Sequence, residues 1–294
     1  MKHRQAVLTM VAATLMWSIA GVVTRHLEAA RSFEVTFWRS AFAALCMALL
    51  LWWLRGAAPL WRVLRQGGTT LWISGACWCV MFTAFMLALT LTSVANVLIT
   101  MALGPLFTAL LSRVVLRHAL PWRTWVAIAM AGAGITWMYG DQFNAGGAQH
   151  LWGTLAALAV PLAAAINWTV LHHHRDDAEV DMLPAVLIGA LLSSAVTLPL
   201  AWPFTASLHD VALLGGLGLV QLAVPCLMAV AAAKALSAPE ASLLSLLEVV
   251  FGVAWAWWGA GEAPALAVLG GGGLVLAALV GNELWGLRRA RVSP

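Results

Sequence analysis

Ten apolar segments follow one another along this 294-residue chain, separated by short polar or charged stretches. Each is about 20 residues long, the length at which an apolar helix spans the hydrocarbon core of a bilayer. Strands of a membrane barrel would alternate polar and apolar residues over about ten positions instead. The pattern therefore predicts an all-α membrane protein with ten transmembrane helices. Their expected positions are about 5–27, 33–54, 70–92, 94–116, 121–139, 151–172, 183–203, 211–236, 239–259 and 264–287.

The ten predicted helices divide evenly at the polar stretch near residue 145. Displacing the chain by about 144 residues lays helix four on helix nine, and helix lengths and short turns recur at that offset. Identical pairs under this displacement are Ala88 with Ala232, Ser93 with Ser237, and Phe107 with Phe251. We predict two five-helix units, residues 1–144 and 145–294. Because five is odd, the second unit would be inverted in the membrane, as in many secondary transporters.

The sixteen Lys and Arg residues sort unevenly between the two ends of the predicted helices. With a cytoplasmic N-terminus, thirteen of them lie on the cytoplasmic side, and Arg25, Arg31 and Arg39 lie on the other. Such an excess of Lys and Arg marks cytoplasmic loops. The charges therefore predict that both termini are cytoplasmic and that the chain crosses the membrane ten times.

The composition argues against several classes of protein. Hydrophobic residues make up 62% of the chain and charged residues 10%, whereas soluble domains are about a quarter charged. The net charge of +4 lies in short loops without interleaved aromatic residues, so nucleic acid is not an expected partner. The four cysteines lie inside apolar segments, which favours apolar packing over a disulfide framework or a metal site. No GxxxxGK motif is present, so we expect neither ATP hydrolysis nor a cofactor.

Two segments have an alternative interpretation: the first predicted helix and the loop after the sixth. The first run ends in Thr24-Arg25-His26 rather than at a small-residue cleavage site, which favours an uncleaved helix over a signal peptide. The three consecutive histidines 172–174 do not converge on one face of a helix, which favours a solvated loop over a metal site.

Glu248 lies about midway along predicted helix nine. A carboxylate at the bilayer centre costs about 2.5–3.5 kcal/mol on insertion scales, so it normally faces a cavity or a partner. It could contact the amine of a substrate or couple transport to protons. Alternatively, it braces neighbouring helices as a structural carboxyl group.

Polar uncharged residues form a second group of candidates. Their spacing places each set on one face of its helix, where it could line a substrate site or form hydrogen bonds between helices, worth about 0.6 kcal/mol each in a membrane. The candidates are Asn96 and Thr100 on helix four, Asn167 on helix six, Gln221 on helix eight, and Ser242 and Ser245, which share a face with Glu248, on helix nine.

The 17 tryptophans divide into two groups. Those near helix ends are typical of the membrane interface, whereas Trp17, Trp78 and Trp168 lie nearer the middle of their helices. Trp78 continues along one face of helix three to Phe82 and Phe85. Trp17, Trp78 and Phe82 are therefore candidate substrate contacts, with helix packing as the alternative. Arg39 is expected to extend to the outer interface, or else to attract carboxylates to an external vestibule.

Proline and glycine positions suggest moving and closely packed helices. Pro105, Pro161 and Pro225 should interrupt helices four, six and eight, where the kinks could act as hinges. Gly132, Gly134 and Gly270–Gly273 lie on helices five and ten, where small residues permit close helix packing. We expect a monomer, or a homodimer formed through helices five and ten.

Several motifs resemble one family. With them, both halves resemble the EamA-type repeats of the drug/metabolite transporter superfamily, and the chain is most similar to bacterial amino acid exporters, the aromatic amino acid exporter among them. The chain departs from the family pattern at Val249, where proline is frequent, and at Arg117-His118, where Gly-Glu is frequent. The resemblance covers essentially the whole chain. It implies a transporter rather than an enzyme, located as a multi-pass protein in the cell inner (plasma) membrane. The motifs are Phe37-Trp38-Arg39-Ser40, Ser93-Val94-Ala95-Asn96, Pro105–Leu110, Ala238–Leu244, Leu247–Phe251 and Gly261-Glu262.

The leading hypothesis is a secondary exporter of small amphipathic metabolites, amino acids of broad range with aromatic ones included. It would work by alternating access around a central cavity built by helices one, three, four, six, eight and nine. The expected partners are the small-molecule substrate and the lipid bilayer. An exporter of lipophilic cations is the nearest alternative, because Glu248 and an aromatic wall would suit a cation equally. An integral-membrane enzyme acting on lipid is a further alternative, although it should show clustered ionisable residues at one membrane face.

Overall fold

The computed structural model describes residues 2–56, 67–115, 121–145, 148–173, 183–233, 235–236 and 244–292. All regular secondary structure within these residues is helical. The first half contains α1 (His3–Trp17), α2 (Ala20–Thr24), α3 (Ser32–Arg55), α5 (Gly68–Leu91), α6 (Val94–Met101), α7 (Gly104–Val115) and α8 (Trp122–Ala145). The second half contains α9 (Ala148–His173), α10 (Leu183–Ala201), α11 (Leu208–Gly216), the π-helix η1 (Leu217–Ala223), α12 (Val224–Ala233), α14 (Leu247–Ala260) and α15 (Leu266–Val292).

Each apolar segment expected from the sequence contains helix in the described residues. Six helices among them are long and apolar enough to cross a membrane, and three shorter apolar helices lie at Leu151–Asn167, Leu247–Ala260 and Leu266–Asn282. The α8 helix, which begins with Trp122 and Arg123, is outside both groups. The all-helical membrane architecture is therefore confirmed, while the number of ten crossings and their orientation stay predictions.

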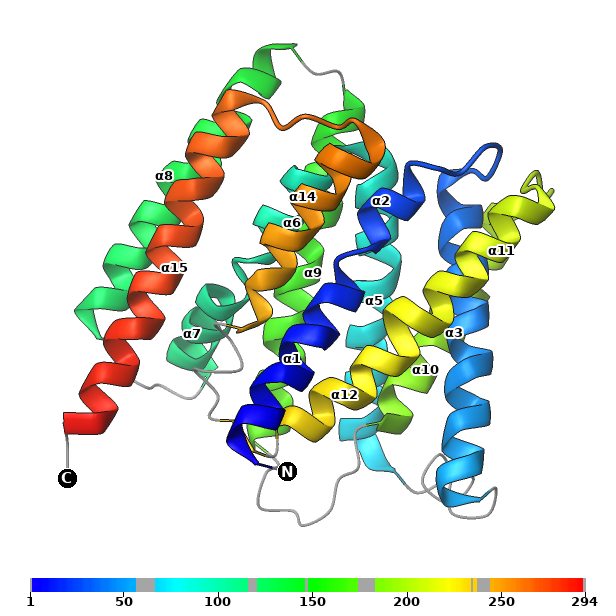
Figure 1. Cartoon of the computed structure of the whole chain (residues 1–294), viewed down its shortest axis with the longest axis horizontal. Coiled ribbons are helices and arrows are strands. Elements are labelled where there is room, and N and C mark those ends of the chain that lie inside the picture. Colours follow the sequence, from blue (N-terminus) through cyan, green and yellow to red (C-terminus); the bar gives the residue numbers. More distant parts are fainter. Residues whose placement is uncertain are drawn as a thin grey trace.

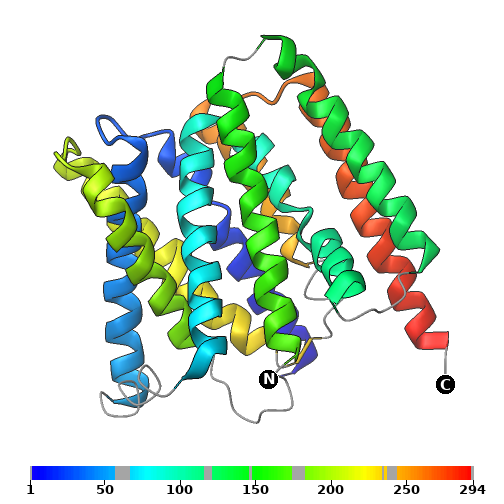
Figure 2. The ribbon, with the colours of Figure 1, turned by 180° about the vertical axis from the view of Figure 1, so that it is seen from behind.

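The helices form one bundle in which two groups lie at opposite edges (Figure 1). The α8 and α15 helices pack along each other at one edge, and α3, α10 and α11 gather at the other. Between them lie α1, α5, α9, α12 and the α6–α14 pair, as the view from behind also shows (Figure 2). The α1 helix begins and the α15 helix ends at the same end of the bundle. The opposite end, where α2 ends and α15 begins, is called the α2 end below.

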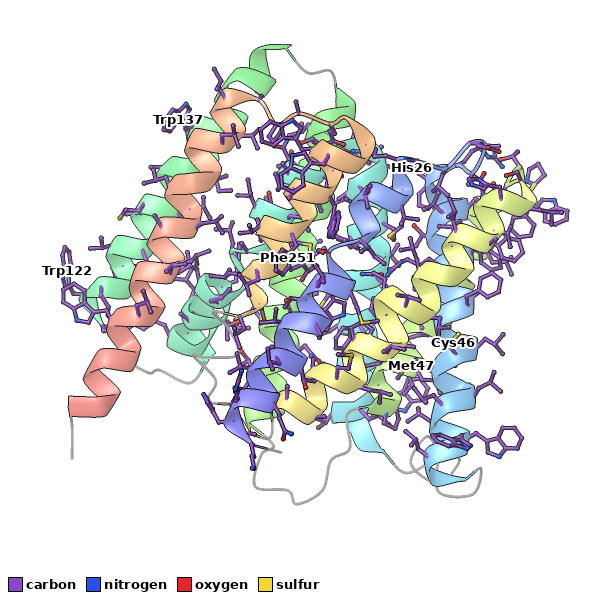
Figure 3. All side chains as sticks on the ribbon, viewed as in Figure 1. His26, Cys46, Met47, Trp122, Trp137 and Phe251 are labelled. Atoms are coloured by element: carbon purple, nitrogen blue, oxygen red, sulfur yellow. The ribbon has the colours of Figure 1, made fainter. Side chains whose placement is uncertain are left out.

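Large apolar side chains cover the outside of the bundle, as the hydrocarbon around a membrane protein requires. Trp122 and Trp137 point outward from α8 (Figure 3). The tryptophans expected at the membrane interface are exposed, namely Trp52, Trp53, Trp122, Trp152, Trp202, Trp258 and Trp285.

Several expected helices are broken near their middle. The first is interrupted after Trp17, where Ser18 and Ile19 take shallow ψ angles of −15°. The Ser18 hydroxyl donates to the carbonyl of Leu15 at 2.7 Å, and such hydrogen bonds to the preceding turn bend helices. The fourth is interrupted between Met101 and Gly104. These breaks divide spans one and four into half-helices.

The three candidate hinge prolines differ in their surroundings. Pro105 lies in the first turn of α7, where its missing N–H costs no helical hydrogen bond. Pro225 follows the π-helix η1, whose wider turn accommodates the proline ring. Pro161 lies inside α9, which continues from Ala148 to His173. The structure therefore shows no break in the helix at Pro161, and the role of this proline as a hinge stays a prediction.

Candidate functional site

Arg39, about two turns into α3, is 1% exposed. Its Nη1 donates to the Oε1 atom of Gln221 at 3.0 Å, and its Nη2 donates to the backbone carbonyl of Phe82 at 3.1 Å. The expectation that this side chain extends to the outer interface is wrong. The guanidinium finds two acceptors inside the bundle, so it has no need to reach water.

Aromatic rings surround the Arg39 guanidinium. Its Cζ atom lies 5.4 Å from the centre of the Phe82 ring and 6.0 Å from that of Phe85, which is the range of cation–π attraction. The Trp78 ring packs on Phe82 with 5.4 Å between ring centres. The aromatic face expected on helix three is therefore present on α5, and two of its rings face a cation.

Gln221 connects Arg39 to the break in the first span. It lies in the π-helix η1, and its Nε2 donates to the backbone carbonyl of Trp17, the last residue of α1, at 3.3 Å. Bulges of π-helix are frequent at functional sites. We call Trp17, Arg39, Phe82, Phe85 and Gln221 the Arg39 cluster.

Close backbone packing positions the Arg39 cluster. A Cβ atom added to Gly218 would lie 2.7 Å from the Ala43 nitrogen and 2.8 Å from the Phe42 Cβ. Gly218 thus allows η1 to approach the backbone of α3 one turn from Arg39. Substitution by any residue with a side chain would push η1, and Gln221 with it, away from α3.

Three hydroxyl groups next to the Arg39 cluster join α3, α5 and α10. The Ser193 Oγ lies 2.9 Å from the Ser40 Oγ and 2.9 Å from the Thr83 Oγ1. Ser40 follows Arg39, and Thr83 follows Phe82. Hydroxyl groups are common in apolar helices, and no spacing in the sequence singled out these three.

Glu248 belongs to a different helix from the residues of the Arg39 cluster. It is in the first turn of α14, directly after a turn at Leu246, rather than in the middle of a continuous helix. The Cys226 thiol interacts with the Trp17 side chain and lies within electrostatic range of both Arg39 and Glu248. Among the described residues, the Glu248 carboxylate has no hydrogen-bonding or ion-pairing partner, and the N-terminus of a helix favours negative charge.

The side chains of Asn96 and Asn167 form hydrogen bonds with residues outside the Arg39 cluster. The Asn96 amide on α6 donates to the Thr92 hydroxyl at 3.2 Å, and Thr100, one turn further along, is fully buried. Asn167 on α9 accepts a 2.6 Å hydrogen bond from the Ser74 hydroxyl on α5. These contacts favour the structural interpretation that the sequence left open.

The serines expected beside Glu248 are only partly described. Ser245 is half-buried one turn before Glu248. Ser242 lies outside the described residues. The α14 helix packs against α6, so the two helices that the repeat makes equivalent do meet.

An ion pair joins three chain segments at the α2 end of the bundle. Arg25 Nε donates to Glu262 Oε2 at 2.5 Å, and its two other nitrogens donate to the carbonyls of Leu89 and Thr92 at 2.6 and 2.8 Å. The other Glu262 oxygen accepts from the Val94 backbone nitrogen at 2.7 Å. We call this set the Arg25–Glu262 network.

The backbone conformation of Gly261 places Glu262 beside Arg25. The α14 helix ends in Gly261 at φ 68°, a left-handed conformation that favours glycine. The next backbone N–H, that of Glu262, returns to the Ala256 carbonyl at 3.0 Å. The motif Gly261-Glu262 therefore has a structural meaning, because the glycine turns the chain and the glutamate joins it to the first half.

Two buried carboxylates hold loops at the same end of the bundle. Asp210 accepts hydrogen bonds from the backbone nitrogens of Glu28, Ala29 and Ala30 at 2.8–2.9 Å. Glu28, His209 and Asp210 could bring one ligand atom each to a metal. Both Asp210 oxygens are already occupied by N–H groups, however, so the geometry favours a structural role for Asp210. Glu34 likewise binds the backbone nitrogens of residues 205 and 206.

Some of the glycines on α8 and α15 lie at the contact between these two helices of the same chain. A Cβ atom on Gly134 would lie 2.5 Å from the Gly271 carbonyl oxygen, and one on Gly270 would lie 2.8 Å from the Trp137 ring. Gly132 and Gly273 have open space beside them. The structure thus assigns Gly134 and Gly270 to the α8–α15 contact, and the homodimer stays a prediction.

Comparison with solved structures supports the fold. One crystal structure, titled only "Crystal structure of protein", matches with a TM-score of 0.62 and 20% sequence identity. The match covers 98% of this chain and 99% of the other. At this identity the likeness extends to the fold alone. No curated protein matches the chain.

A match to a family model identifies the family of the chain. The model described as the EamA-like transporter family matches residues 4–140 and again residues 151–282. The first match contains α1 to most of α8, with Trp17, Arg39, Phe82 and Phe85, and the second contains η1 with Gln221. Together the two matches cover most of the chain, which therefore belongs to the EamA-like transporter family of the drug/metabolite transporter superfamily, a family of small-molecule membrane transporters.

Proposed function

We propose that this protein exports amino acids, aromatic ones included, by alternating access. The observation that carries the proposal is the Arg39 cluster, in which one buried cation and two aromatic rings from the first family match meet a glutamine from the second. A guanidinium suits a carboxylate, and aromatic rings suit an apolar or aromatic side chain. Both features belong to an amphipathic amino acid.

The broken helices supply a way of moving. Transporter sites commonly lie where helices are discontinuous, because freed backbone groups and helix ends can bind the substrate. Here the breaks after Trp17 and Met101 and the π-helix η1 lie on three such helices. In the proposed cycle these points bend, and the halves open alternately toward the two sides of the membrane.

The Arg25–Glu262 network would close one of the two sides. It joins α2, the turn between α5 and α6, and the loop between α14 and α15. The distribution of Lys and Arg predicts that this side faces away from the cytoplasm. In the proposed cycle, the network breaks when substrate leaves and forms again when the empty protein returns.

Counterflow in proteoliposomes tests the proposal. Purified protein would be reconstituted with unlabelled amino acids inside, and uptake of labelled phenylalanine, tryptophan, leucine and lysine measured with and without a pH gradient. Uptake above that of empty liposomes for at least one apolar or aromatic amino acid is expected. Absence of uptake for every amino acid would contradict the proposal.

The same assay separates the second candidate, an exporter of lipophilic cations. Glu248, a carboxylate without a described partner, favours that function. Labelled tetraphenylphosphonium would then be transported while the amino acids are not. Transport of both would indicate a broad exporter of amphipathic solutes.

A further inference from the structure

Arg39 is a buried positive charge with neutral partners. Its two hydrogen-bond acceptors are an amide oxygen and a backbone carbonyl, and its Nε has no partner in the described structure. Removing a charge from water is unfavourable unless an opposite charge and further hydrogen bonds compensate for it. Among the described residues, no carboxylate forms an ion pair with Arg39. The described residues therefore do not compensate the positive charge of Arg39, and an anion is the group that would compensate it.

Arg25 shows how this chain satisfies an arginine that has a structural task. All three of its nitrogens donate, to a glutamate oxygen and to two backbone carbonyls. Arg25 is also partly exposed, with a quarter of its side chain in contact with the surroundings. Arg39, in contrast, is 1% exposed, its Nε donor has no acceptor, and no described carboxylate pairs with it. A buried charge nevertheless requires such a partner more than an exposed charge does.

Gln221 occupies the position that an anion would take. Its Oε1 accepts the Nη1 hydrogen bond as a carboxylate oxygen would, but without charge. Beyond that bond, Gln221 is held by a longer 3.3 Å hydrogen bond to the Trp17 carbonyl. A carboxylate bound to the free edge of the guanidinium could use Nε together with an Nη atom, the paired geometry that arginine offers carboxylates. The amide would move aside and release the Trp17 carbonyl at the break of the first span.

The neighbouring groups fit the remainder of such a solute. The Phe82 and Phe85 rings flank the guanidinium and offer faces to an apolar side chain.

We propose that Arg39 is the residue that binds the carboxylate of the transported solute and that makes the protein select amino acids over the corresponding amides and amines. This inference rests on the proposed function, and it names the group that decides the substrate class. Binding would exchange the Gln221 amide for the solute carboxylate, which links occupancy of the site to the α1 break.

Counterflow of labelled phenylalanine and labelled phenylalaninamide tests the assignment, because the second solute carries an uncharged carboxamide where the first carries a carboxylate. The wild type should prefer phenylalanine at least about tenfold, the value of one charge-assisted hydrogen bond or more. Arg39→Gln should lower phenylalanine uptake at least about tenfold and remove the preference, with Arg39→Lys between the two. Arg113→Gln, the same change at an exposed arginine of α7, should behave as wild type.

Gln221→Glu gives a second test that keeps Arg39 in place. An internal carboxylate at this position should pair with the guanidinium, raise the thermal stability, and weaken phenylalanine uptake by raising the half-saturating concentration at least about tenfold. An unchanged half-saturating concentration would overturn the inference. So would an Arg39→Gln protein that keeps the wild-type preference, or one that loses both solutes equally while remaining folded.

Failure of the inference differs from failure of the proposed function. If the wild type transports phenylalanine and Arg39→Gln keeps the preference, only the role of Arg39 is wrong. If the wild type transports tetraphenylphosphonium and neither phenylalanine nor its amide, the proposed function fails, and the role of Arg39 in amino acid selection fails with it.

Discussion

At the scale of single residues, two charges inside the apolar spans carry the proposed chemistry. The sequence singled out Glu248 because a lone carboxylate deep in an apolar run is costly. It discounted Arg39, which lies nearer a helix end. In the structure Arg39 is instead the stronger candidate, because it is buried and hydrogen-bonded inside the bundle, whereas Glu248 lies in the first turn of α14.

Substitution of Glu248 by glutamine should lower amino acid uptake at least about tenfold, because a neutral amide loses the attraction for an ammonium group. The protein should still insert and elute as a monodisperse peak in detergent, since the side chain keeps its size. Proteoliposome counterflow between pH 5.5 and 8.5 measures the effect. Glu28→Gln, at an exposed loop carboxylate, serves as the matched control. Normal uptake with an unaltered pH profile in Glu248→Gln would exclude the role.

At the scale of elements, glycine sets how closely helices approach. On α8, Gly134 faces the backbone of α15, whereas Gly132, two residues earlier, faces open space. Helical residues two apart point in different directions, so the sequence could not say which glycine packs inside the chain. The structure distinguishes them by what an added methyl group would meet.

Gly134→Ala should therefore destabilise the protein by about 1–3 kcal/mol, the usual cost of forcing extra atoms into a packed contact. Gly132→Ala should be neutral or slightly stabilising, because alanine favours helix over glycine by about 1 kcal/mol. Thermal unfolding of the two purified variants in detergent compares them directly. Equal melting temperatures would contradict the close packing of Gly134 against α15.

At the scale of the whole molecule, the Arg25–Glu262 network ties the two family matches together at the α2 end. Partly exposed ion pairs contribute about 1 kcal/mol or less, which suits a link that would break and form again in each turn of the proposed cycle. Its backbone hydrogen bonds to Leu89, Thr92 and Val94 make it a connection among segments rather than between two side chains.

Glu262→Gln should shift the protein toward conformations open at this end. Spin labels at Glu28 and Ala265, exposed positions of the two halves, would report a longer distance in a population increased about fivefold, the equivalent of about 1 kcal/mol. Arg25→Gln should act in the same way. Because Arg25→Gln also removes the hydrogen bonds to the Leu89 and Thr92 carbonyls, the double variant should open no further than Arg25→Gln alone. A distance distribution identical to that of the wild type would show that the network does not hold this end closed.

The orientation in the membrane is a separate prediction at this scale. In a cysteine-free background, a membrane-impermeant maleimide should label Ala263→Cys from outside intact cells, because the charge distribution places the α14–α15 loop there. Arg4→Cys should be labelled only after the cells are permeabilised. The reverse pattern would show that the chain is inserted the other way.

The sequence by itself determined the class of molecule and the course of its helices. Apolar runs of about 20 residues favour helix for a backbone in lipid, and most described helix ends lie within a few residues of their expected positions, although α8 and α15 extend past theirs. The aromatic face from Trp78 to Phe85 was also predictable, because side chains three and four positions apart share a helix face. The family followed from motifs spread over both halves.

Only the tertiary structure decided which residues meet. Arg39 and Gln221 are 182 positions apart and are joined because Gly218 lets η1 approach α3. No proline in the sequence marks the break after Trp17. The Trp17 carbonyl at this break accepts a hydrogen bond from Gln221, which is distant along the chain. Local periodicity determines which face of a helix a residue occupies, but the packing of helices distant in sequence determines what that face contacts. That is why the charge at the proposed substrate site became visible only when the helices were placed together.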